Sequence, residues 1–369
     1  MADAPLSVRV VGSGLIGTSI GLALTRAGWD VSVDDASETT AFLARDLGAG
    51  RLPADEDQPD VVVVATPPDV TAHVVAGTLS RWPRAVVTDV ASVKGVIAEE
   101  LTQSGADLAR YCGSHPMAGR EKSGAVSGRY DLFDGRAWVL TPTSDTAPES
   151  IDVIRSMATA TGAAVVVLDP ASHDAAVAAV SHVPQLISSL MAARLTDLPD
   201  SAVALAGQGL RDVTRVAASD PGLWTQILSG NAAAVREVLG ALAQDLDGVL
   251  GALDLLSADA SSRVPGDAPG ARGTIAQAIA AGNAGHARIP GKHGTAPTAY
   301  TTVRVLIPDR PGQLGRLFAD VGELGINIEE FRLDHGLGAA FGLAEVDVVP
   351  VVAVELAEGL TERGWRIHA

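Results

Sequence analysis

The sequence contains a single cysteine, Cys112, among its 369 residues. One cysteine excludes an internal disulfide framework and any metal site built from several cysteines, and we predict no bound metal. The N-terminal residues show no basic segment followed by an apolar one, and no uninterrupted apolar run reaches roughly 18 residues. We therefore expect a cytoplasmic protein with no membrane segment.

Basic residues are scarce relative to acidic ones. The chain has 27 Lys and Arg against 44 Asp and Glu, which gives a net charge of −17 and a pI near 4.8. This charge would repel nucleic acid and anionic membrane surfaces, so we expect neither as a partner. Hydrophobic residues make up 47% of the sequence, which is ample for burial. A chain of this length exceeds one comfortable core and predicts two or three domains.

A glycine motif, Gly12-Ser13-Gly14-Leu15-Ile16-Gly17, follows the first apolar run. Gly12 suits a tight turn, Gly14 leaves room for a pyrophosphate, and Gly17 lets the next helix pack closely. Backbone N–H groups and the helix dipole would then bind the phosphates without a basic side chain. The motif therefore predicts a dinucleotide site.

An acidic pair closes the next predicted strand and bears on the choice of cofactor. Asp34 could accept hydrogen bonds from both adenosine ribose hydroxyls and would repel a 2′-phosphate, which favours NAD over NADP. If the strand register is shifted by one residue, Asp35 takes this role instead. The alternative interpretation is that the acidic pair belongs to a solvated turn. The predicted NAD-binding residues are Gly12, Ser13, Gly14, Leu15, Ile16, Gly17, Asp34, Thr66, Pro67 and Ser92.

The first 171 residues alternate apolar runs with helical patterns, which is typical of βαβ units on a parallel sheet. Several predicted strands are rich in valine, as strands covered on both faces are. We predict an α/β, Rossmann-type dinucleotide-binding domain over residues 1–171. Its strands are expected at 8–11, 30–34, 60–65, 85–89, 111–114, 137–141 and 164–168.

After residue 171 the pattern of predicted strands and helices changes. Residues 172–260 predict an all-helical domain, and the apolar spacing over 232–256 fits a core face, a dimer interface or both. Residues 261–298, rich in Gly, Pro and Ala around a short helix at 274–281, predict a linker. Residues 299–369 predict a ferredoxin-like βαββαβ unit. Its elements are expected at 300–307, 311–324, 326–334, 339–349, 352–363 and 365–368.

Polar residues stand at the predicted strand ends, where ligands bind in open α/β sheets. Ser92 and Lys94 follow one strand, although an ordinary helix N-cap and a first-turn lysine would give the same pattern. His115 ends another strand, before a loop punctuated by glycines. With an ordinary pKa near ~6.5, a histidine there could accept a proton from a hydroxyl while hydride leaves the same carbon. We predict His115 as the catalytic base.

The helical region supplies a candidate anchor for an anionic substrate. Arg215 could bind a carboxylate through two parallel hydrogen bonds, with Asp212 one helical turn away. A surface Asp–Arg pair on a helix is the alternative interpretation.

Together these segments resemble the prephenate/arogenate dehydrogenase family over nearly the whole chain. The motifs that support the resemblance are residues 12–17, Asp89-Val90-Ala91-Ser92-Val93-Lys94-Gly95, His115-Pro116-Met117-Ala118-Gly119-Arg120-Glu121, Ser181-His182-Val183-Pro184, and Arg211-Asp212-Val213-Thr214-Arg215 with Trp224.

The resemblance implies a role for each matching residue. The histidine matching His115 hydrogen-bonds the ring hydroxyl, and Ser92 would orient that hydroxyl and His115. The arginine matching Arg215 binds a substrate carboxylate, and Glu121 lies where a gating acid is expected. The remaining matches to substrate-pocket residues are His182, Trp224 and Gln185.

The resemblance also implies the reaction, an NAD-dependent oxidative decarboxylation of prephenate to 4-hydroxyphenylpyruvate in tyrosine biosynthesis. Conversion of arogenate to tyrosine is the close alternative. Gln185 stands where many bacterial members have a second histidine, which leaves the choice between keto and amino side chains open. A non-catalytic amino-acid sensor would not need Ser92, His115 and Arg215. A β-hydroxyacid dehydrogenase would need a helical lysine, and residues 172–260 contain none.

The last segment resembles an ACT domain, a unit that binds amino acids at paired interfaces. The resemblance implies feedback inhibition by tyrosine in a homodimer. A purely structural dimerisation unit is the alternative. The residues that match effector-binding turns are Asp309, Arg310, Pro311, Gly312, Gln313, Leu314, Asn327 and Ile328.

Overall fold

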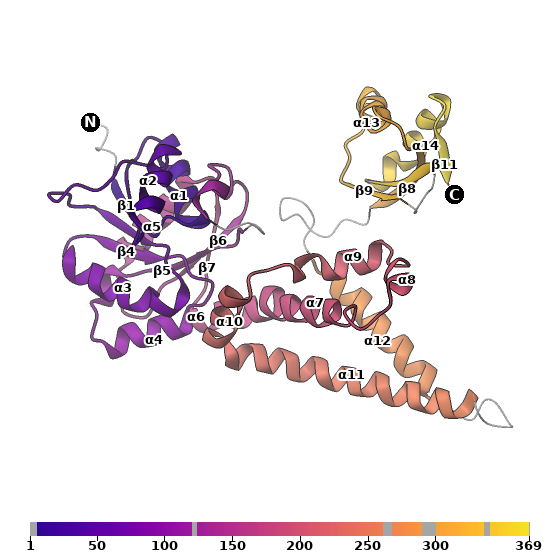
Figure 1. Ribbon diagram of the computed structural model, residues 1–369, viewed down its shortest axis with the longest axis horizontal. Coiled ribbons are helices and arrows are strands. Elements are labelled where there is room, and N and C mark those ends of the chain that lie inside the picture. Colours follow the sequence, from indigo (N-terminus) through magenta and orange to yellow (C-terminus); the bar gives the residue numbers. More distant parts are fainter. Residues whose placement is uncertain (1–5, 120–123, 261–267, 290–299, 336–339, 369) are drawn as a thin grey trace. The chain divides into compact units, whose positions relative to one another are not determined.

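The computed structural model describes residues 6–119, 124–260, 268–289, 300–335 and 340–368. The chain forms two compact units, Met1–Gln244 and Asp245–Ala369. Figure 1 shows the first as a layered α/β body followed by helices, and the second as a helical segment followed by a small sheet.

The N-terminal unit is built on a parallel sheet of four strands in the order β2-β1-β3-β4. Because the strand order reverses between β1 and β3, the carboxyl ends of these two strands form the crevice in which such sheets bind ligands. All four valines of β3 are fully buried, as expected for a strand covered on both faces. The strands are β1 (Ser7–Val11), β2 (Asp30–Asp34), β3 (Val61–Val64) and β4 (Val86–Asp89), and the helices are α1 (Leu15–Arg26), α2 (Glu38–Asp46), α3 (Pro68–Arg81) and α4 (Gly95–Gln103).

A second sheet of three strands departs from the predicted all-parallel arrangement. Strands β5 (Gly113–Pro116), β6 (Ala137–Thr141) and β7 (Ala164–Val167) lie in this order, with β5 antiparallel to β6 and β6 parallel to β7. Tyr111 makes one parallel bridge to Val87, and the strand proper begins two residues later than the predicted 111–114. A parallel partner needs a crossover helix, which α5 (Pro148–Ala160) supplies only between β6 and β7.

The helical part of the N-terminal unit follows β7. One continuous stretch combines α6 (Pro170–Val177), a π-helical turn (Ala178–His182) and α7 (Val183–Ala193). The Val183 amide donates to the Ala178 carbonyl five residues back. The wider turn lies where Pro184, which has no N–H, enters the helix. The later helices are α8 (Asp200–Val203), α9 (Gln208–Thr214), α10 (Pro221–Gly230) and α11 (Ala232–Ala260).

This stretch, Pro170–Ala193, is alone among the described helices in being long and apolar enough to cross a membrane, with a mean hydropathy of 1.4. The core helix of a soluble protein passes the same test, and 33% of the window is buried inside the protein. The run is interrupted by polar residues, among them the buried His182 and Gln185.

Helix α10 joins the helical part to the edge of the sheet. Its Ile227 is 5% exposed and packs into the core formed under α3 and α4. Gly230 lies so close to the loop after β4 that a Cβ atom there would be 3.1 Å from the Val93 side chain. Residues 224–231 are therefore held beside the strand ends.

The second unit contains α12 and an antiparallel sheet in the order β11-β8-β10-β9. The βαββαβ element order matches the one predicted, and Leu317, Leu356 and Leu360 are fully buried against the sheet. Helix α12 is longer than the predicted 274–281, because its alanine-rich flanks continue the helix. The elements are α12 (Ala271–His286), β8 (Thr301–Pro308), α13 (Gln313–Glu323), β9 (Glu330–His335), β10 (Phe341–Val348), α14 (Ala353–Glu362) and β11 (Arg366–His368).

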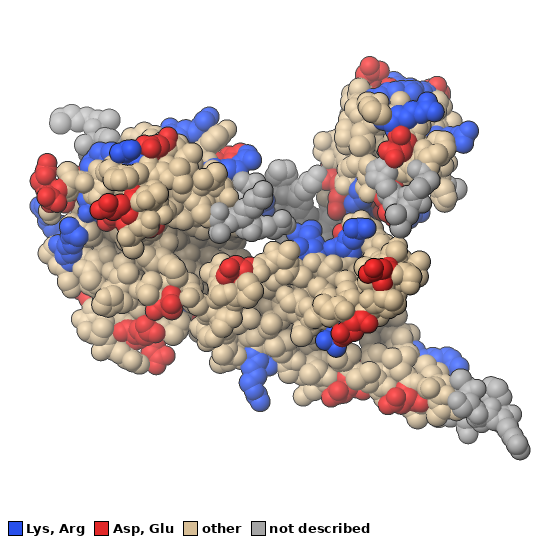
Figure 2. Space-filling model, viewed as in Figure 1, with Lys and Arg blue, Asp and Glu red and all other residues tan. Residues whose placement is uncertain are grey.

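Charged side chains of both signs cover the N-terminal unit. On the face shown in Figure 2, Lys and Arg side chains are interspersed with Asp and Glu, and wide uncharged areas lie over the helical part. Along α11 the exposed apolar residues follow helical spacing at Leu242, Leu246, Leu250 and Leu253. Such an apolar stripe indicates a surface made for another helix.

Candidate active site

The glycine loop after β1 combines two positions fixed by packing with one that is open. Gly12 has a φ of +99°, and a Cβ atom there would lie 2.4 Å from the Ala65 carbonyl oxygen at the end of β3. A Cβ atom on Gly17 would lie 1.8 Å from the Gly12 carbonyl oxygen. At Gly14 a Cβ atom would meet nothing within 4 Å. Protein packing requires the first two glycines, and the space over Gly14 fits a pyrophosphate.

Helix α1 begins directly behind this space with Gly14 as its N-cap and no capping side chain. The first amides of a helix without such a cap remain available to bind phosphate oxygens. The residues present therefore fit the predicted dinucleotide.

The two acidic residues after β2 have different surroundings. Asp35 accepts hydrogen bonds from the backbone N–H groups of Ser13 (2.7 Å) and Ser37 (2.9 Å), so its carboxylate braces the glycine loop. The backbone carbonyl of Asp34 accepts from the Gly12 amide at 2.8 Å. Within the described part of the chain, no hydrogen bond engages the Asp34 carboxylate. The geometry favours Asp34 over Asp35 as the ribose ligand.

Three further predicted cofactor residues lie at the carboxyl ends of β3 and β4. Thr66 is half-buried, and its hydroxyl lies 3.1 Å from that of Thr71. Pro67 is exposed and is the N-cap of α3. Ser92 is half-buried in the loop between β4 and α4. The strand order places all three at the same edge as the glycine loop.

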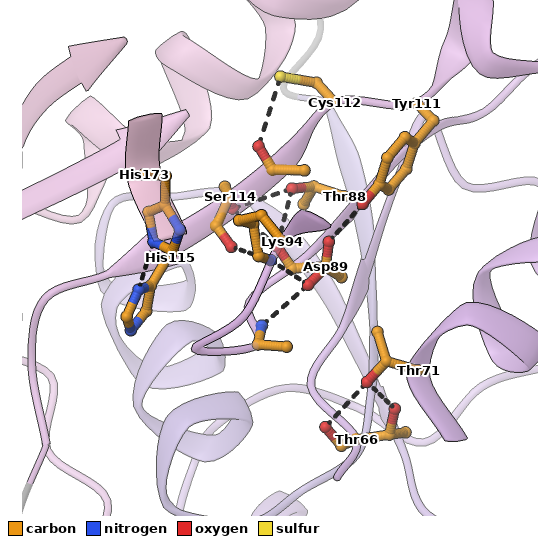
Figure 3. Close-up of polar contacts among 12 residues, drawn as sticks. Thr66, Thr71, Thr88, Asp89, Lys94, Tyr111, Cys112, Ser114, His115 and His173 are labelled. Atoms are coloured by element: carbon orange, nitrogen blue, oxygen red, sulfur yellow. Dashed lines mark hydrogen bonds and ion pairs between the residues drawn. The ribbon is translucent and has the colours of Figure 1, made fainter. Parts of the chain in front are cut away.

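A buried ion pair lies beneath this edge. Lys94 is 1% exposed and forms an ion pair with Asp89, which is fully buried. The Lys94 ammonium also donates to the Ser114 carbonyl (2.7 Å), and the Tyr111 hydroxyl donates to Asp89 (2.6 Å), as Figure 3 shows. The interpretation of Ser92 as a helix N-cap and Lys94 as a first-turn lysine is therefore wrong, because Lys94 is itself the N-cap of α4 and is buried. The cluster ties the end of β4 to β5.

Burial governs the titration of this cluster. It lowers the pKa of Lys94 despite the opposing charge of Asp89. Burial, reinforced by Asp89, raises the pKa of Tyr111 well above its ordinary value. Burial also raises the pKa of Cys112 to about 12, which makes the thiol an inert core group.

His115 lies on β5 in contact with a second histidine that the sequence did not single out. Its Nδ1 atom is 2.9 Å from Nε2 of His173, at the start of α6 (Figure 3). The other nitrogen of His173 is 2.8 Å from Asp174 Oδ1. Asp174 also accepts from the backbone N–H groups of Lys94 (3.0 Å) and Gly95 (2.8 Å), and so caps α4 from 80 residues away. The sequence signal was only a His-Asp pair opening a helical run.

The surroundings of His115 change its titration. Burial, together with the nearby His173, Lys94 and His182, lowers its pKa well below 6.5. The expectation of an ordinary value is therefore wrong. His115 is neutral at neutral pH, which is the form that accepts a proton.

His182 and Trp224, two of the predicted substrate residues, lie in contact with each other. Their rings meet edge to face, with centroids 6.1 Å apart. The Asn231 amide nitrogen donates to the Asp174 carbonyl (2.8 Å) and lies 3.1 Å from Nδ1 of His182. Because that amide group is a donor, Nδ1 of His182 is an acceptor and Nε2 carries the proton in the neutral ring. Burial lowers the pKa of His182 to about 4.

The other predicted substrate residues have separate surroundings. Gln185 is 6% exposed on α7, and its side-chain oxygen accepts from the Ser219 hydroxyl at 3.4 Å. Arg215 begins a single 3-10 turn (Arg215–Ala217) and is exposed. Asp212, expected to support Arg215, accepts instead from Gln208 at 2.7 Å. Glu121 lies outside the described residues.

The sequence matches two family models. Residues 20–167 match the nucleotide-binding domain of prephenate dehydrogenase, and residues 169–259 match its dimerization domain. A probable prephenate dehydrogenase, NovF, from Streptomyces niveus is 36% identical over 359 residues, covering 96% of this chain and 98% of that protein. The chain belongs to the prephenate dehydrogenase family.

Two solved structures of related proteins show the same fold over about 70% of this family member. Synechocystis arogenate dehydrogenase has a TM-score of 0.58 at 30% identity, covering 68% of this chain and 92% of that one. Prephenate dehydrogenase from Aquifex aeolicus, solved with hydroxyphenyl propionate and NAD+, has a TM-score of 0.62 at 26% identity, covering 72% and 95%.

The glycine loop provides a matched pair of substitutions. Gly17→Ala places a methyl group on the Gly12 carbonyl, so we expect a lower Tm and loss of NAD binding. Gly14→Ala meets no protein atom, so Tm should stay near that of the wild type while the Kd for NAD rises. Thermal unfolding and NAD titration of both variants check this. A Gly14→Ala protein that binds NAD normally would show that the pyrophosphate lies elsewhere.

Proposed function

We propose that this protein is an NAD-dependent prephenate dehydrogenase, which oxidatively decarboxylates prephenate to 4-hydroxyphenylpyruvate. The observation on which the proposal rests is the position of His115, which is hydrogen-bonded to His173 on a strand tied by Ser114 to the carboxyl end of β4 in a dinucleotide-binding sheet. Family membership over nearly the full chain supports the same reaction.

The chemistry needs a base, an anchor and a hydride acceptor, and NAD supplies the acceptor when bound. Nε2 of His115 accepts the proton of the ring hydroxyl as hydride leaves the same carbon. The bond to the ring carboxylate then breaks and carbon dioxide departs. Its electron pair completes the aromatic ring, and the phenolate oxygen takes the proton back from His115. The products are 4-hydroxyphenylpyruvate, carbon dioxide and NADH.

The roles of the remaining site residues follow the family pattern. Ser92 orients the hydroxyl, and Arg215, exposed on its 3-10 turn, binds a substrate carboxylate. His182 presents a donor at Nε2 beside Trp224. Gln185 and Glu121 complete the substrate-binding set.

Arogenate is the second candidate substrate, and one residue favours it. Gln185 offers an amide where a second histidine would stand, so it can accept a hydrogen bond from an amino group. The similarity to the arogenate dehydrogenase of Synechocystis adds weight. Assays of prephenate and arogenate, each with NAD and NADP, decide between them, and a strong preference for arogenate or NADP would replace the leading assignment.

We also assign the domains and a regulatory unit. The NAD-binding domain spans residues 1–171, the helical substrate and dimerisation domain 172–260, the linker 261–298 and a ferredoxin-like ACT domain 299–369. The apolar stripe of α11 supports a homodimer. In the ACT domain, Gly312, with a φ of +87°, starts α13, and Asn327 donates to Glu329 at 2.9 Å. These turns support an amino-acid site formed by the residues that the resemblance matched.

Replacing His115 with Asn tests the base. The variant keeps a hydrogen-bonding side chain but cannot take up the hydroxyl proton, so kcat/KM should fall by roughly 10²- to 10⁴-fold. The Kd for NAD should change little, because the glycine loop is untouched. Steady-state kinetics and NAD titration measure both, and near-normal turnover would exclude His115 as the base.

Replacing Arg215 with Ala tests the anchor. Loss of a charge-assisted hydrogen bond to a carboxylate should raise KM roughly 10-fold or more, with a smaller change in kcat. Arg194→Ala removes another exposed arginine of the helical part and serves as the control. An effect confined to kcat would contradict the anchoring role.

Tyrosine is the expected effector. Saturating tyrosine should lower the rate at fixed prephenate and raise Tm, because a ligand that binds the folded dimer stabilises it. Rate assays and thermal unfolding with phenylalanine in parallel measure both effects. If tyrosine alters neither quantity, the regulatory assignment fails for this ligand.

A further inference from the structure

The hydrogen bonds around Asp174 and His173 determine which ring nitrogens of His173 and His115 carry protons. The backbone N–H groups of Lys94 and Gly95 each donate to a different oxygen of this carboxylate, at 3.0 and 2.8 Å. A backbone N–H is always a donor, and two such donors stabilise the ionised form of the acid, so we treat Asp174 as a carboxylate that only accepts hydrogen bonds. Any third partner of Asp174 must therefore be a donor too.

That third partner is Nδ1 of His173, at 2.8 Å from Oδ1. His173 is 0% exposed, so water does not compete for its nitrogens. With its proton on Nδ1, the neutral ring has an unprotonated Nε2, which can only accept. The next nitrogen in the chain must supply the hydrogen.

Nδ1 of His115 is that nitrogen, 2.9 Å from Nε2 of His173. It must carry a proton, and the neutral His115 ring then leaves Nε2 as its lone-pair nitrogen. Among the residues that the structure describes, no hydrogen bond engages this Nε2. His173 therefore holds the Nδ1 edge of this half-buried ring, and Nε2 lies on the other edge.

We propose that His173 and Asp174 are positioning residues that hold His115 as the Nδ1–H tautomer, with Nε2 as its proton-accepting atom. The inference deepens the proposed function, on which its catalytic meaning rests, because a base with its proton on Nε2 could not receive the substrate hydroxyl proton there. A fixed tautomer also removes the need to turn the ring before each reaction.

The same chain stabilises the charged state that His115 reaches during the reaction. When Nε2 takes up a proton, the ring becomes an imidazolium that faces the cationic Lys94 and the rings of His173 and His182. Asp174 is the anion linked to it through His173, and it offsets this unfavourable field. Asp89 does not compensate the charge of His115, because it forms an ion pair with Lys94.

The proton positions can be observed directly. In protein labelled with ¹⁵N-histidine, long-range ¹H–¹⁵N spectra at neutral pH distinguish protonated from unprotonated ring nitrogens, and His115→Asn identifies the signals of His115. We expect Nδ1–H with unprotonated Nε2 for both His115 and His173. Finding the proton of His115 on Nε2 in the wild type would overturn the proposal, whatever the substrate of the enzyme is.

A pair of variants tests the consequence for catalysis. His173→Gln keeps a donor for Asp174 and an acceptor for His115, whereas His173→Leu keeps only bulk. We expect the Leu variant to lose roughly 10- to 100-fold in kcat with KM nearly unchanged and mixed tautomers at His115, and the Gln variant to recover most of both. His286→Leu, at an exposed position of α12, is the control.

The outcomes separate this inference from the proposed function. Equal losses in the Leu and Gln variants, or an unaltered tautomer in the Leu variant, would reduce His173 to a packing residue. Should the wild type oxidise neither prephenate nor arogenate, the proposed function fails, and the spectra of the unliganded protein still decide the tautomer.

Discussion

The candidate site depends on the buried ion pair between Lys94 and Asp89. Taking two charges out of water costs several kcal/mol per ion, which is repaid only when hydrogen bonds occupy the remaining lone pairs and protons. Here Tyr111 and the Ser114 carbonyl provide them. Removing one partner would leave an uncompensated charge in the core. The pair therefore fixes β4, β5 and the start of α4 in a single arrangement, and His115 is presented from that frame.

Around this frame, the two parts of the candidate site differ in how their residues are held. The glycine loop is shaped by backbone contacts, since Gly12 and Gly17 leave no room for a side chain. The histidine side is shaped by side-chain hydrogen bonds that run from α6 and α10 to β5. The shape of the glycine loop thus depends on backbone atoms that exclude side chains. The arrangement of the histidines depends on which atom of each hydrogen bond donates and which accepts.

Local patterns were enough to predict much of this arrangement. The strands at 30–34 and 137–141 form as predicted, because a short run of mainly β-branched or apolar residues bounded by turns specifies its own extent. The glycine motif also follows from a short segment, in which Gly12 and Gly17 stand where a side chain would clash. The antiparallel β5 could not be predicted, since strand direction depends on the path of the following loop rather than on the strand.

Local sequence signals are weaker for residues whose role depends on distant partners. His173 and Asp174 look like an ordinary polar start to a helix, and Lys94 looks like a surface lysine. Their roles arise from contacts across 58, 80 and 20 positions, which no local periodicity encodes. The lowered pKa of His115 has the same origin, because burial and neighbouring charges are properties of the assembled site.

The cap that Asp174 places on α4 has a consequence for how such a protein is divided. Asp174 accepts hydrogen bonds from two backbone amides of the nucleotide-binding part, whereas Asp174 itself lies in the helical part. A nucleotide-binding domain cut free at residue 167 would retain its glycine loop but lose the partner that orders its histidine. The boundary between the two domains in the sequence therefore runs through the candidate site, and recombining such domains would change the surroundings of His115 together with the helical part.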